Sequence, residues 1–178
     1  TVKEIATIAY ELSEGRIDFA LIDWLPAIPD GLPQVKGELY PLGDSISNLV
    51  TNSFDATQQK AQKIQERQMT RAPQDPDPYR SQVKLRVRAE RDDGDNPWVV
   101  IEVQDNGIGM TEDELSLLFH PFFTTKATSE KGTGLGLFVI RTIVEKHGGT
   151  IGVKSAYGVE TTFTIRLPAL AKEGKSHA

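Results

Sequence analysis

Hydrophobic residues recur at the spacing of an α-helix in three stretches of the chain. Over residues 2–12 they fall on one face, and Gly15 follows as a stop signal. The same spacing returns over 42–64 and again over 135–146, where the glycine pair 148–149 marks the end. The pattern therefore predicts three main helices.

Alternation of apolar and polar residues appears between these helices. Residues 82–90 and 97–105 alternate on either side of "RDDGDNP", whose Asp-Gly pair is typical of a β-hairpin turn. A second hairpin is predicted at 150–156 and 161–168. Residues 17–26 alternate and end in proline, which favours a strand at the edge of a sheet.

Two further stretches have local patterns of their own. Residues 67–82 contain three prolines and no apolar period, so we expect an exposed loop. A short helix is expected at 112–118, because Thr111 and Glu114 have the spacing of a capping box.

The composition narrows the class of protein. Of the 178 residues, 38% are hydrophobic and 25% charged, which fits one globular domain with its own core. A net charge of -5 argues against nucleic-acid binding, which needs a clustered basic surface. The lack of cysteine excludes disulfides and thiolate metal sites, and no apolar run approaches the roughly 20 residues that span a bilayer. Because the chain begins at Thr1, we expect it to be part of a longer protein.

Two asparagines stand one helical turn apart in "SISNLVTNSFDAT", residues 45–57. Asparagine is a poor helix former, because its side chain competes for its own backbone. Asn48 and Asn52 lie away from the apolar stripe of the predicted helix. They are therefore either solvated or placed to hold a ligand.

The stretch "VQDNGIGM" sets Asp105 at the end of a predicted strand, with Gly107 and Gly109 close behind. Asp-Asn-Gly is also a common turn, so the stretch has a purely structural interpretation. The functional interpretation is that a carboxylate beside bare backbone accepts an amino group from a flat ring lying against glycine.

A second glycine-rich stretch, "KGTGLGL" at 131–137, runs into the third main helix. It lacks the leading strand and spacing of a dinucleotide fingerprint, and no Gly-Lys-Ser/Thr follows as in a P-loop. Its glycines serve either the turn alone or a phosphate, which unhindered N–H groups at a helix N-terminus would bind.

Between the two glycine stretches lies "LFHPFFTTKATSE", residues 118–130. We expect a hinged lid here, anchored by Phe119, Phe122 and Phe123 and loose from 124 to 131. The alternative is an ordinary surface loop.

Together these stretches resemble the ATP-binding catalytic domain of sensor histidine kinases, in the superfamily of DNA gyrase, MutL and heat-shock ATPases. "NLVTNSFDA" resembles the N box, "DNGIGM" the first glycine box, "FHPFFTTK" the F box and "GTGLGL" the second glycine box, in the family's order. The resemblance covers about residues 17–168. It implies an α+β fold, a two-layer α/β sandwich of Bergerat type with a mixed sheet of about five strands and helices on one face.

The resemblance also implies ATP as substrate, Mg²⁺ as cofactor and a set of site residues. The catalytic pair is Asn48 and Asn52, of which Asn52 holds the Mg²⁺ and Asn48 faces the phosphates. Asp105 reads adenine, and Thr161 and Thr162 line its pocket. The expected nucleotide-binding residues are Asp105, Gly107, Ile108, Gly109, Met110, Phe123, Thr124, Thr125, Lys126, Lys131, Gly132, Thr133, Gly134, Leu135, Gly136, Leu137 and Thr162.

Four positions depart from the family's usual pattern. Asp55 stands where many of these kinases have a basic residue, and Ser53 replaces the commoner alanine. His120 replaces an acidic residue of the F box. Glu160 falls where a glycine commonly precedes the threonine, which puts the local turn in doubt.

The family pattern implies a division of the chain and a set of partners. Residues 1–16 would form a helix leading from a dimerisation hairpin, 17–168 the catalytic domain and 169–178 a flexible tail. The phosphoacceptor histidine would lie on that dimerisation domain of the same protein, because none of the three histidines here has an acceptor context. A response regulator would act downstream. We expect a cytoplasmic, monomeric segment without membrane contact, in a homodimeric parent that is a candidate for inner-membrane anchoring.

Two other functions compete with the kinase. An ATP-hydrolysing domain of the gyrase or MutL type would carry a glutamate as general base at the position of Asn48, and an amide cannot take that role. A nucleotide-gated binding module would bind ATP and change its affinity for a partner without transferring phosphate.

Overall fold

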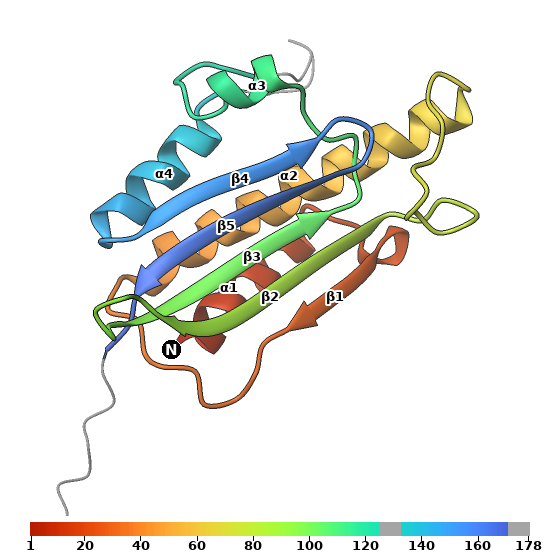
Figure 1. Ribbon diagram of the computed structural model, residues 1–178. Coiled ribbons are helices and arrows are strands. Elements are labelled where there is room, and N and C mark those ends of the chain that lie inside the picture. The colour runs from red at the N-terminus through yellow and green to blue at the C-terminus, as the bar shows by residue number, and fades with distance from the viewer. Residues whose placement is uncertain (125–132, 171–178) are drawn as a thin grey trace, which may run out of the picture.

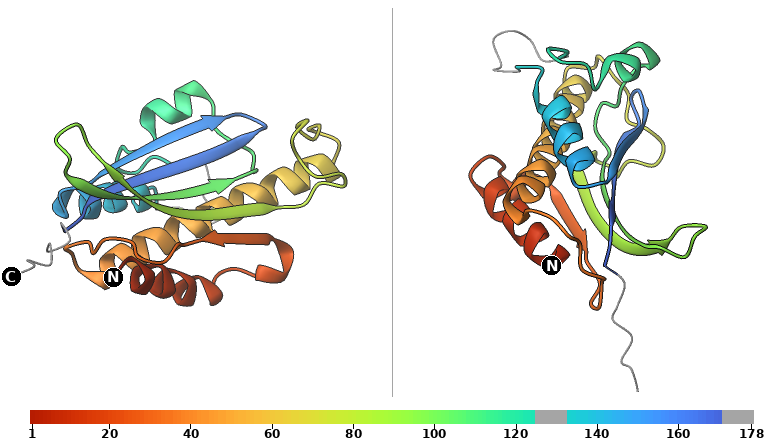
Figure 2. Two further views of the ribbon diagram at one scale, coloured as in Figure 1. Left: turned by 60° about the horizontal axis from the view of Figure 1, so that its bottom comes forward. Right: turned by 90° about the vertical axis from the view of Figure 1, so that its left-hand side faces the viewer.

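A five-stranded mixed sheet and the helices on one of its faces form two layers (Figures 1 and 2), as predicted. The computed structural model describes residues 1–124 and 133–170. The strand order is β1-β2-β3-β5-β4, with β1 parallel to β2 and the other neighbours antiparallel. The elements are α1 (Val2–Glu14), the 3-10 turn η1 (Phe19–Leu21), β1 (Asp23–Ala27), α2 (Leu39–Gln65), β2 (Gln82–Arg91), β3 (Pro97–Asp105), α3 (Glu112–Leu117), α4 (Gly136–Lys146), β4 (Thr150–Ala156) and β5 (Glu160–Pro168).

The core lies between the sheet and the helices because each strand buries alternate residues. On β3, Val99, Ile101 and Val103 face the helices, while Glu102 and Gln104 point to the open face. Each fully buried aliphatic side chain contributes about 1.5 to 3 kcal/mol relative to an exposed one. The alternation therefore determines which end residues of the strands reach the helical side.

Helix α1 packs directly on α2, in the same core as the sheet. Its Val2, Ile5 and Ala9 are buried, and the Ser13 and Ser47 hydroxyls of the two helices are 3.0 Å apart. The helix is thus part of the folded unit described here. Its connection to a dimerisation hairpin stays a prediction.

The predicted hairpins and the short helix are confirmed, but the first strand is shorter than predicted. The Asp18 side chain accepts from the Ala20 N–H and starts a 3-10 turn, so the chain becomes extended only at Asp23. Phe19 stacks on Tyr10 of α1, with ring centroids 5.0 Å apart. Packing against α1 thus replaced the strand expected at 17–22.

The segment between α2 and β2, called here the 66–81 loop, has no helix or strand, as expected. It is not wholly exposed, however, because Ala72, Asp75 and Ser81 are buried. Asp75 pairs with Lys60 of α2, and neither side chain has any exposed surface. A local pattern of prolines and polar residues cannot reveal a partner on a distant helix.

His147 links the end of α4 to the start of α2. Its Nδ1 donates to the Ile143 carbonyl at 2.7 Å, and its Nε2 accepts from the Glu38 N–H at 3.0 Å. Both ring nitrogens are therefore engaged, as in a histidine that closes a helix end.

Candidate functional site

Asp105 is a deeply buried carboxyl group among the residues expected to bind the nucleotide. It ends β3 on the helical side, is 2% exposed, and accepts from the Gly107 N–H at 2.9 Å. Burial raises its pKa to about 7, against the opposing effects of Ser53, the Gly107 amide and Lys60. The carboxyl group therefore changes charge near neutral pH.

Ser53, one of the departures from the family pattern, lies beside this carboxyl group. Its hydroxyl is buried and near enough to favour the ionised form. It nevertheless completes no hydrogen bond of good geometry with any residue that the structure describes. A buried hydroxyl without a partner costs free energy, so this position favours a polar ligand atom.

The first glycine stretch is held closely against its neighbours. A Cβ atom at Gly107 would lie 2.7 Å from the Ala56 carbonyl carbon, and Gly109 has a φ of +67° that other residues rarely adopt. The Ile108 N–H donates to the Ala56 carbonyl at 3.1 Å. Gly107 thus lets the segment after β3 lie against α2, and Gly109 lets it lie against the backbone at Ala156, at the end of β4. Both are structural requirements separate from any contact with a ring.

Asn48 and Asn52 differ in what their amides do. Asn48 accepts from Arg16 at 3.0 Å and donates to Asp44 at 3.1 Å, so protein groups set its orientation. The Asn52 amide is half-buried and makes no hydrogen bond within residues 1–124 and 133–170. An amide oxygen is a suitable hard ligand for Mg²⁺, and Asn52 therefore fits the predicted role.

Helix α4 begins without a side-chain cap, which leaves its first N–H groups without that partner. Position 134 requires glycine, because its φ is +66° and a Cβ atom there would collide with the backbone of Phe122. Position 136 does not, because a Cβ there would meet no atom within 4 Å. The open space at Gly136 fits the approach of a phosphate to the helix N-terminus.

Gly136→Ala should separate this ligand role from a structural one. Alanine favours the helix, so the free energy of unfolding should stay unchanged or rise by up to about 1 kcal/mol. ATP affinity, measured by calorimetry, should fall about tenfold, because the methyl group stands in front of the amides that receive the phosphate. Gly152→Ala is the matched control, since its Cβ would also meet nothing within 4 Å and it lies on β4. Equal ATP affinities for the two variants would contradict the phosphate role.

The aromatic residues before the second glycine stretch are only partly as expected. Phe119 packs against the core, but Phe122 is 76% exposed and lies outside the core of the described residues. Its φ of +66°, beside Gly134, turns the side chain outward. Phe123 is half-buried and Thr124 exposed. The remaining lid positions, including Thr125, Lys126, Lys131 and Gly132, lie outside the described residues.

The register of β5 corrects the threonine assignment. Thr161 is opposite Asp105, is 4% exposed, and shares the helical face with it. Thr162 pairs with Gln104, and its side chain points to the open face. Because successive strand residues point to opposite faces, Thr161 and not Thr162 lies on the side of the Asp105 carboxyl group.

Other predicted nucleotide-binding residues make the following contacts. Met110 N–H donates to Ser155 Oγ at 2.9 Å, and Thr133 Oγ1 accepts from the Leu135 N–H at 3.4 Å. Leu137 packs partly into the core. Among the residues described, no cluster of three or more His, Asp or Glu side chains could hold a metal.

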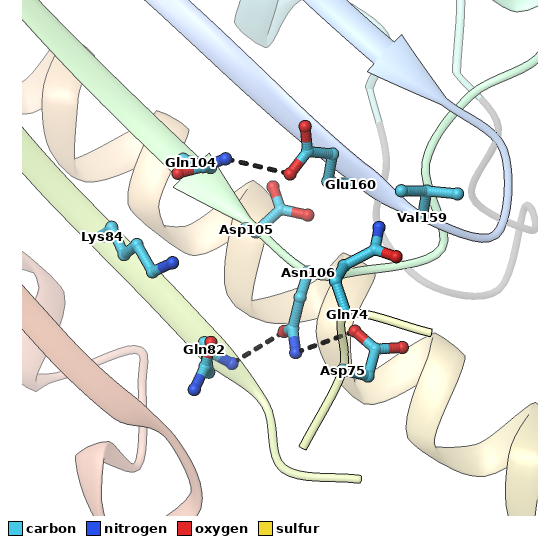
Figure 3. Close-up of a pocket in the computed structure, with 9 residues that line it drawn as sticks. All are labelled: Gln74, Asp75, Gln82, Lys84, Gln104, Asp105, Asn106, Val159 and Glu160. Carbon is cyan, nitrogen blue, oxygen red and sulfur yellow. Dashed lines mark hydrogen bonds between the residues drawn. The ribbon is translucent and has the colours of Figure 1, made fainter. Parts of the chain in front are cut away.

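A cavity of about 230 Å³ opens on the other face of the sheet (Figure 3). Of the predicted site residues only Asp105 lines it, and its lining includes none of the glycines of the two glycine-rich stretches and neither Asn48 nor Asn52. The cavity is therefore not the predicted nucleotide site. Its lining residues are Gln74, Asp75, Gln82, Lys84, Gln104, Asp105, Asn106, Val159 and Glu160.

Sequence reasoning missed Lys60, which lies fully buried near Asp105. The available signal was its spacing, because it continues the series of buried positions Val50, Ser53 and Thr57 along α2. A lysine on a buried stripe indicates a specific partner, since unpaired charges are rarely buried.

Comparison with known proteins finds similarity to histidine kinases in both sequence and structure. The family described as histidine kinase-, DNA gyrase B-, and HSP90-like ATPase matches residues 39–171. Sensor histidine kinase ZraS of Salmonella typhimurium is 45% identical over 87 residues, which are 49% of this chain and 18% of ZraS. Sensor kinase CckA of Brucella abortus is 36% identical over 143 residues, or 80% of this chain and 14% of CckA. The chain thus spans less than a fifth of these relatives.

Solved structures share the fold. The nucleotide-free catalytic domain of histidine kinase ThkA superposes with a TM-score of 0.66 at 25% identity, covering 94% of this chain and 91% of that one. The mycobacterial sensor histidine kinase MprB gives 0.65 at 23% identity, with 94% and 95% coverage, a likeness of fold alone.

Proposed function

The chain belongs to the histidine kinase-, DNA gyrase B-, and HSP90-like ATPase family, and we propose that it is the ATP-binding catalytic part of a sensor histidine kinase. It binds ATP with Mg²⁺ and transfers the γ-phosphate to a histidine on a separate dimerisation domain of the same protein. One observation carries the proposal: the buried carboxyl group of Asp105 faces the helices from β3, on the side of the sheet that carries the Asn52 amide of α2 and the N-terminus of α4, which has no side-chain cap. The Asn52 amide makes no hydrogen bond within the described residues.

The adenine base is assigned to Asp105. The ionised carboxylate accepts from the exocyclic amine of adenine, whereas guanine presents a carbonyl oxygen at that position. The buried Ser53 hydroxyl beside it offers a second polar contact to the same edge of the base. Together these groups favour ATP and ADP over GTP.

The triphosphate is assigned to Asn52 and the N-terminus of α4. Asn52 would hold Mg²⁺, which supplies positive charge against the phosphate oxygens. The first N–H groups of α4 would receive a phosphate through hydrogen bonds and the helix dipole. Both groups position the γ-phosphate for attack by a nucleophile from outside the chain.

Transfer rather than hydrolysis follows from the residue at position 48. A water-activating base needs an ionisable side chain, and Asn48 has none. Asp44, one turn earlier on α2, accepts from Asn48 and lies 3.8 Å from the Arg16 guanidinium. Those contacts favour a structural role for this carboxylate.

The acceptor is assigned to another domain because the histidines described here are unsuitable. His147 uses both ring nitrogens within the fold, bonded to the backbone of Glu38 and Ile143. In the proposed step an imidazole nitrogen of the partner attacks the γ-phosphorus, the bond to the bridging oxygen breaks, and ADP leaves. The imidazole proton passes to a base on the partner domain.

The proposal is tested by mixing the chain with labelled ATP, Mg²⁺ and the helical-hairpin domain of the same protein. The hairpin domain should acquire phosphate that is labile in acid and stable in alkali, while the chain alone neither labels itself nor turns over ATP rapidly. Rapid turnover without the hairpin would favour the gyrase-like ATPase. ATP binding that changes affinity for the hairpin without labelling it would favour the nucleotide-gated module.

The remaining assignments keep the status of predictions. They include the downstream response regulator, the homodimeric parent and the cytoplasmic location. None of the helices within residues 1–124 and 133–170 combines the length and apolar character needed to cross a bilayer.

A further inference from the structure

Lys60 is a buried cation with no role in the function proposed above. It lies on α2 eight residues after Asn52, and its side chain has no exposed surface. The ammonium group donates to the Asn106 carbonyl at 2.9 Å and the Val159 carbonyl at 3.2 Å, and pairs with Asp75 at 2.7 Å. Its three donors thus join the ends of β3 and β5 to the 66–81 loop.

Asp75 completes this arrangement from the loop. It has a buried side chain, accepts from the Ala72 N–H at 2.9 Å, and receives an amide hydrogen of Asn106 at 3.3 Å. The ring of Tyr79 lies 5.3 Å from the Lys60 ammonium, and its hydroxyl donates to the Asn106 carbonyl at 3.1 Å. The loop therefore contacts Asn106 at several points.

Asn106, the residue after Asp105, is held from every side (Figure 3). Its side-chain oxygen accepts from the Gln82 N–H at 2.8 Å, and its amide nitrogen donates to Asp75 and to the Arg80 carbonyl at 3.0 Å. Its carbonyl receives both Lys60 and Tyr79. The backbone that carries Asp105 is consequently fixed at its next residue.

The charges around Asp105 act in opposite directions. In the described part of the chain they are Lys60 from α2 and Glu160 from β5, while Tyr79 of the loop, whose pKa is raised by burial, is an uncharged neighbour. Burial raises the pKa of Asp105, Glu160 raises it further, and Lys60 lowers it. Lys60 is the cation among them.

We infer that Lys60, secured by Asp75, is a positioning residue for the nucleotide base: it holds the Asp105–Asn106 backbone in place and keeps the Asp105 carboxyl group able to accept a hydrogen bond near neutral pH. The inference rests on the proposed function, because it assigns a use to the carboxyl group that reads adenine. It also gives the 66–81 loop a role, as the source of the counter-ion that keeps this lysine charged.

The test must remove the charge without leaving a buried group unpaired. Lys60→Met alone leaves the Asp75 carboxylate buried without a counter-ion, so this variant is expected to unfold readily. Lys60→Met combined with Asp75→Asn removes both charges at similar side-chain volume. Replacing a buried pair by uncharged groups is often tolerated. Lys63→Met is the matched control, because it lies three residues further along the same helix.

In the nucleotide-free protein, the Asp105 carboxyl carbon can be titrated by NMR. The midpoint should move up in the double variant by about one pH unit and stay in place in Lys63→Met. Asp75→Asn alone keeps the lysine and removes its counter-ion, so its midpoint should not rise. An unchanged midpoint in a folded double variant would overturn the inference, as would a rise in Asp75→Asn.

ATP binding adds a second readout with its own pH dependence. Relative to wild type, the double variant should bind ATP about fivefold more weakly at pH 7 and within about twofold at pH 9. A purely structural role for Lys60 predicts equal losses at both pH values and would overturn the inference. If wild type binds no ATP at any pH, the proposed function fails, while the NMR titration still decides the role of Lys60.

Discussion

Asp105→Ala should weaken ATP binding by about 10- to 150-fold, because a hydrogen bond to a charged group contributes about 1.5 to 3 kcal/mol. The carboxyl group is 2% exposed, so little water can replace the lost acceptor. Calorimetry at pH 8, where the group is ionised, is the appropriate measurement. Wild type should also prefer ATP to GTP, and the variant should lose most of that preference.

Burial of the Asp105 carboxyl group should lower the free energy of unfolding at neutral and higher pH. Its pKa is raised from 3.8 to about 7 in the folded state, so folding favours the protonated form, and stability falls as pH rises from 3.8 to about 7 and levels off above that. Asp105→Asn removes this titration while keeping an acceptor for the Gly107 N–H. The nucleotide-free variant should therefore melt at a higher temperature than wild type at pH 8, with a smaller difference below pH 6.

A variant elsewhere on β3 tests whether these effects belong to Asp105 and not to any carboxylate of the strand. Glu102→Gln changes a carboxylate on the open face and should alter neither ATP affinity nor the pH dependence of melting beyond the small effect of a surface ion pair. An Asp105→Ala variant that binds ATP as wild type does, or equal affinity of wild type for GTP, would remove the basis for the adenine assignment.

Asn52→Ala should abolish labelling of the partner hairpin, with a loss of at least about 100-fold, because charge neutralisation at the γ-phosphate is a large part of phosphoryl transfer. In calorimetry, Mg²⁺ should increase the ATP affinity of wild type and leave that of the variant unchanged. The free energy of unfolding should change by no more than about 0.5 kcal/mol, since this amide makes no hydrogen bond within the described residues.

Gln59→Ala is the matched control for this experiment, because it removes an exposed amide from the same helix. It should leave labelling and the effect of Mg²⁺ intact. A large drop in the melting temperature of Asn52→Ala would show that the amide is structural, and retained labelling would show that Mg²⁺ is held by other groups.

Elements defined by local contacts were predictable from the sequence. Thr111 and Glu114 form the predicted capping box, because both partners lie within one helical turn. The hairpin around Asp93 and Gly94 has the expected pairing, because a short turn sets the register of its strands. The four motifs in order indicated a histidine kinase ATP-binding domain, and the family match confirms that prediction.

The candidate site stays a prediction, but the elements that carry its residues can be compared with the motifs. Asp105 faces the helices from β3, Asn52 lies on α2, and Gly136 begins α4. Residue spacing could not show that Asn48 is engaged by Arg16, which comes from the end of α1. It also could not show that Phe122 points outward, since that follows from backbone packing against Gly134.

By itself, then, the sequence determined the helices, the hairpins and the family, because each depends on contacts a few residues apart or on motifs read in order. The residues that would contact ATP stay predictions. Tertiary structure alone decided that Thr161 rather than Thr162 shares the face of Asp105, since strand register is a relation between distant segments. It alone decided that Lys60 is buried against Asp75, 15 positions away across an irregular loop. The charge state of Asp105 follows from that burial, because desolvation is a property of the packed interior and not of any local pattern.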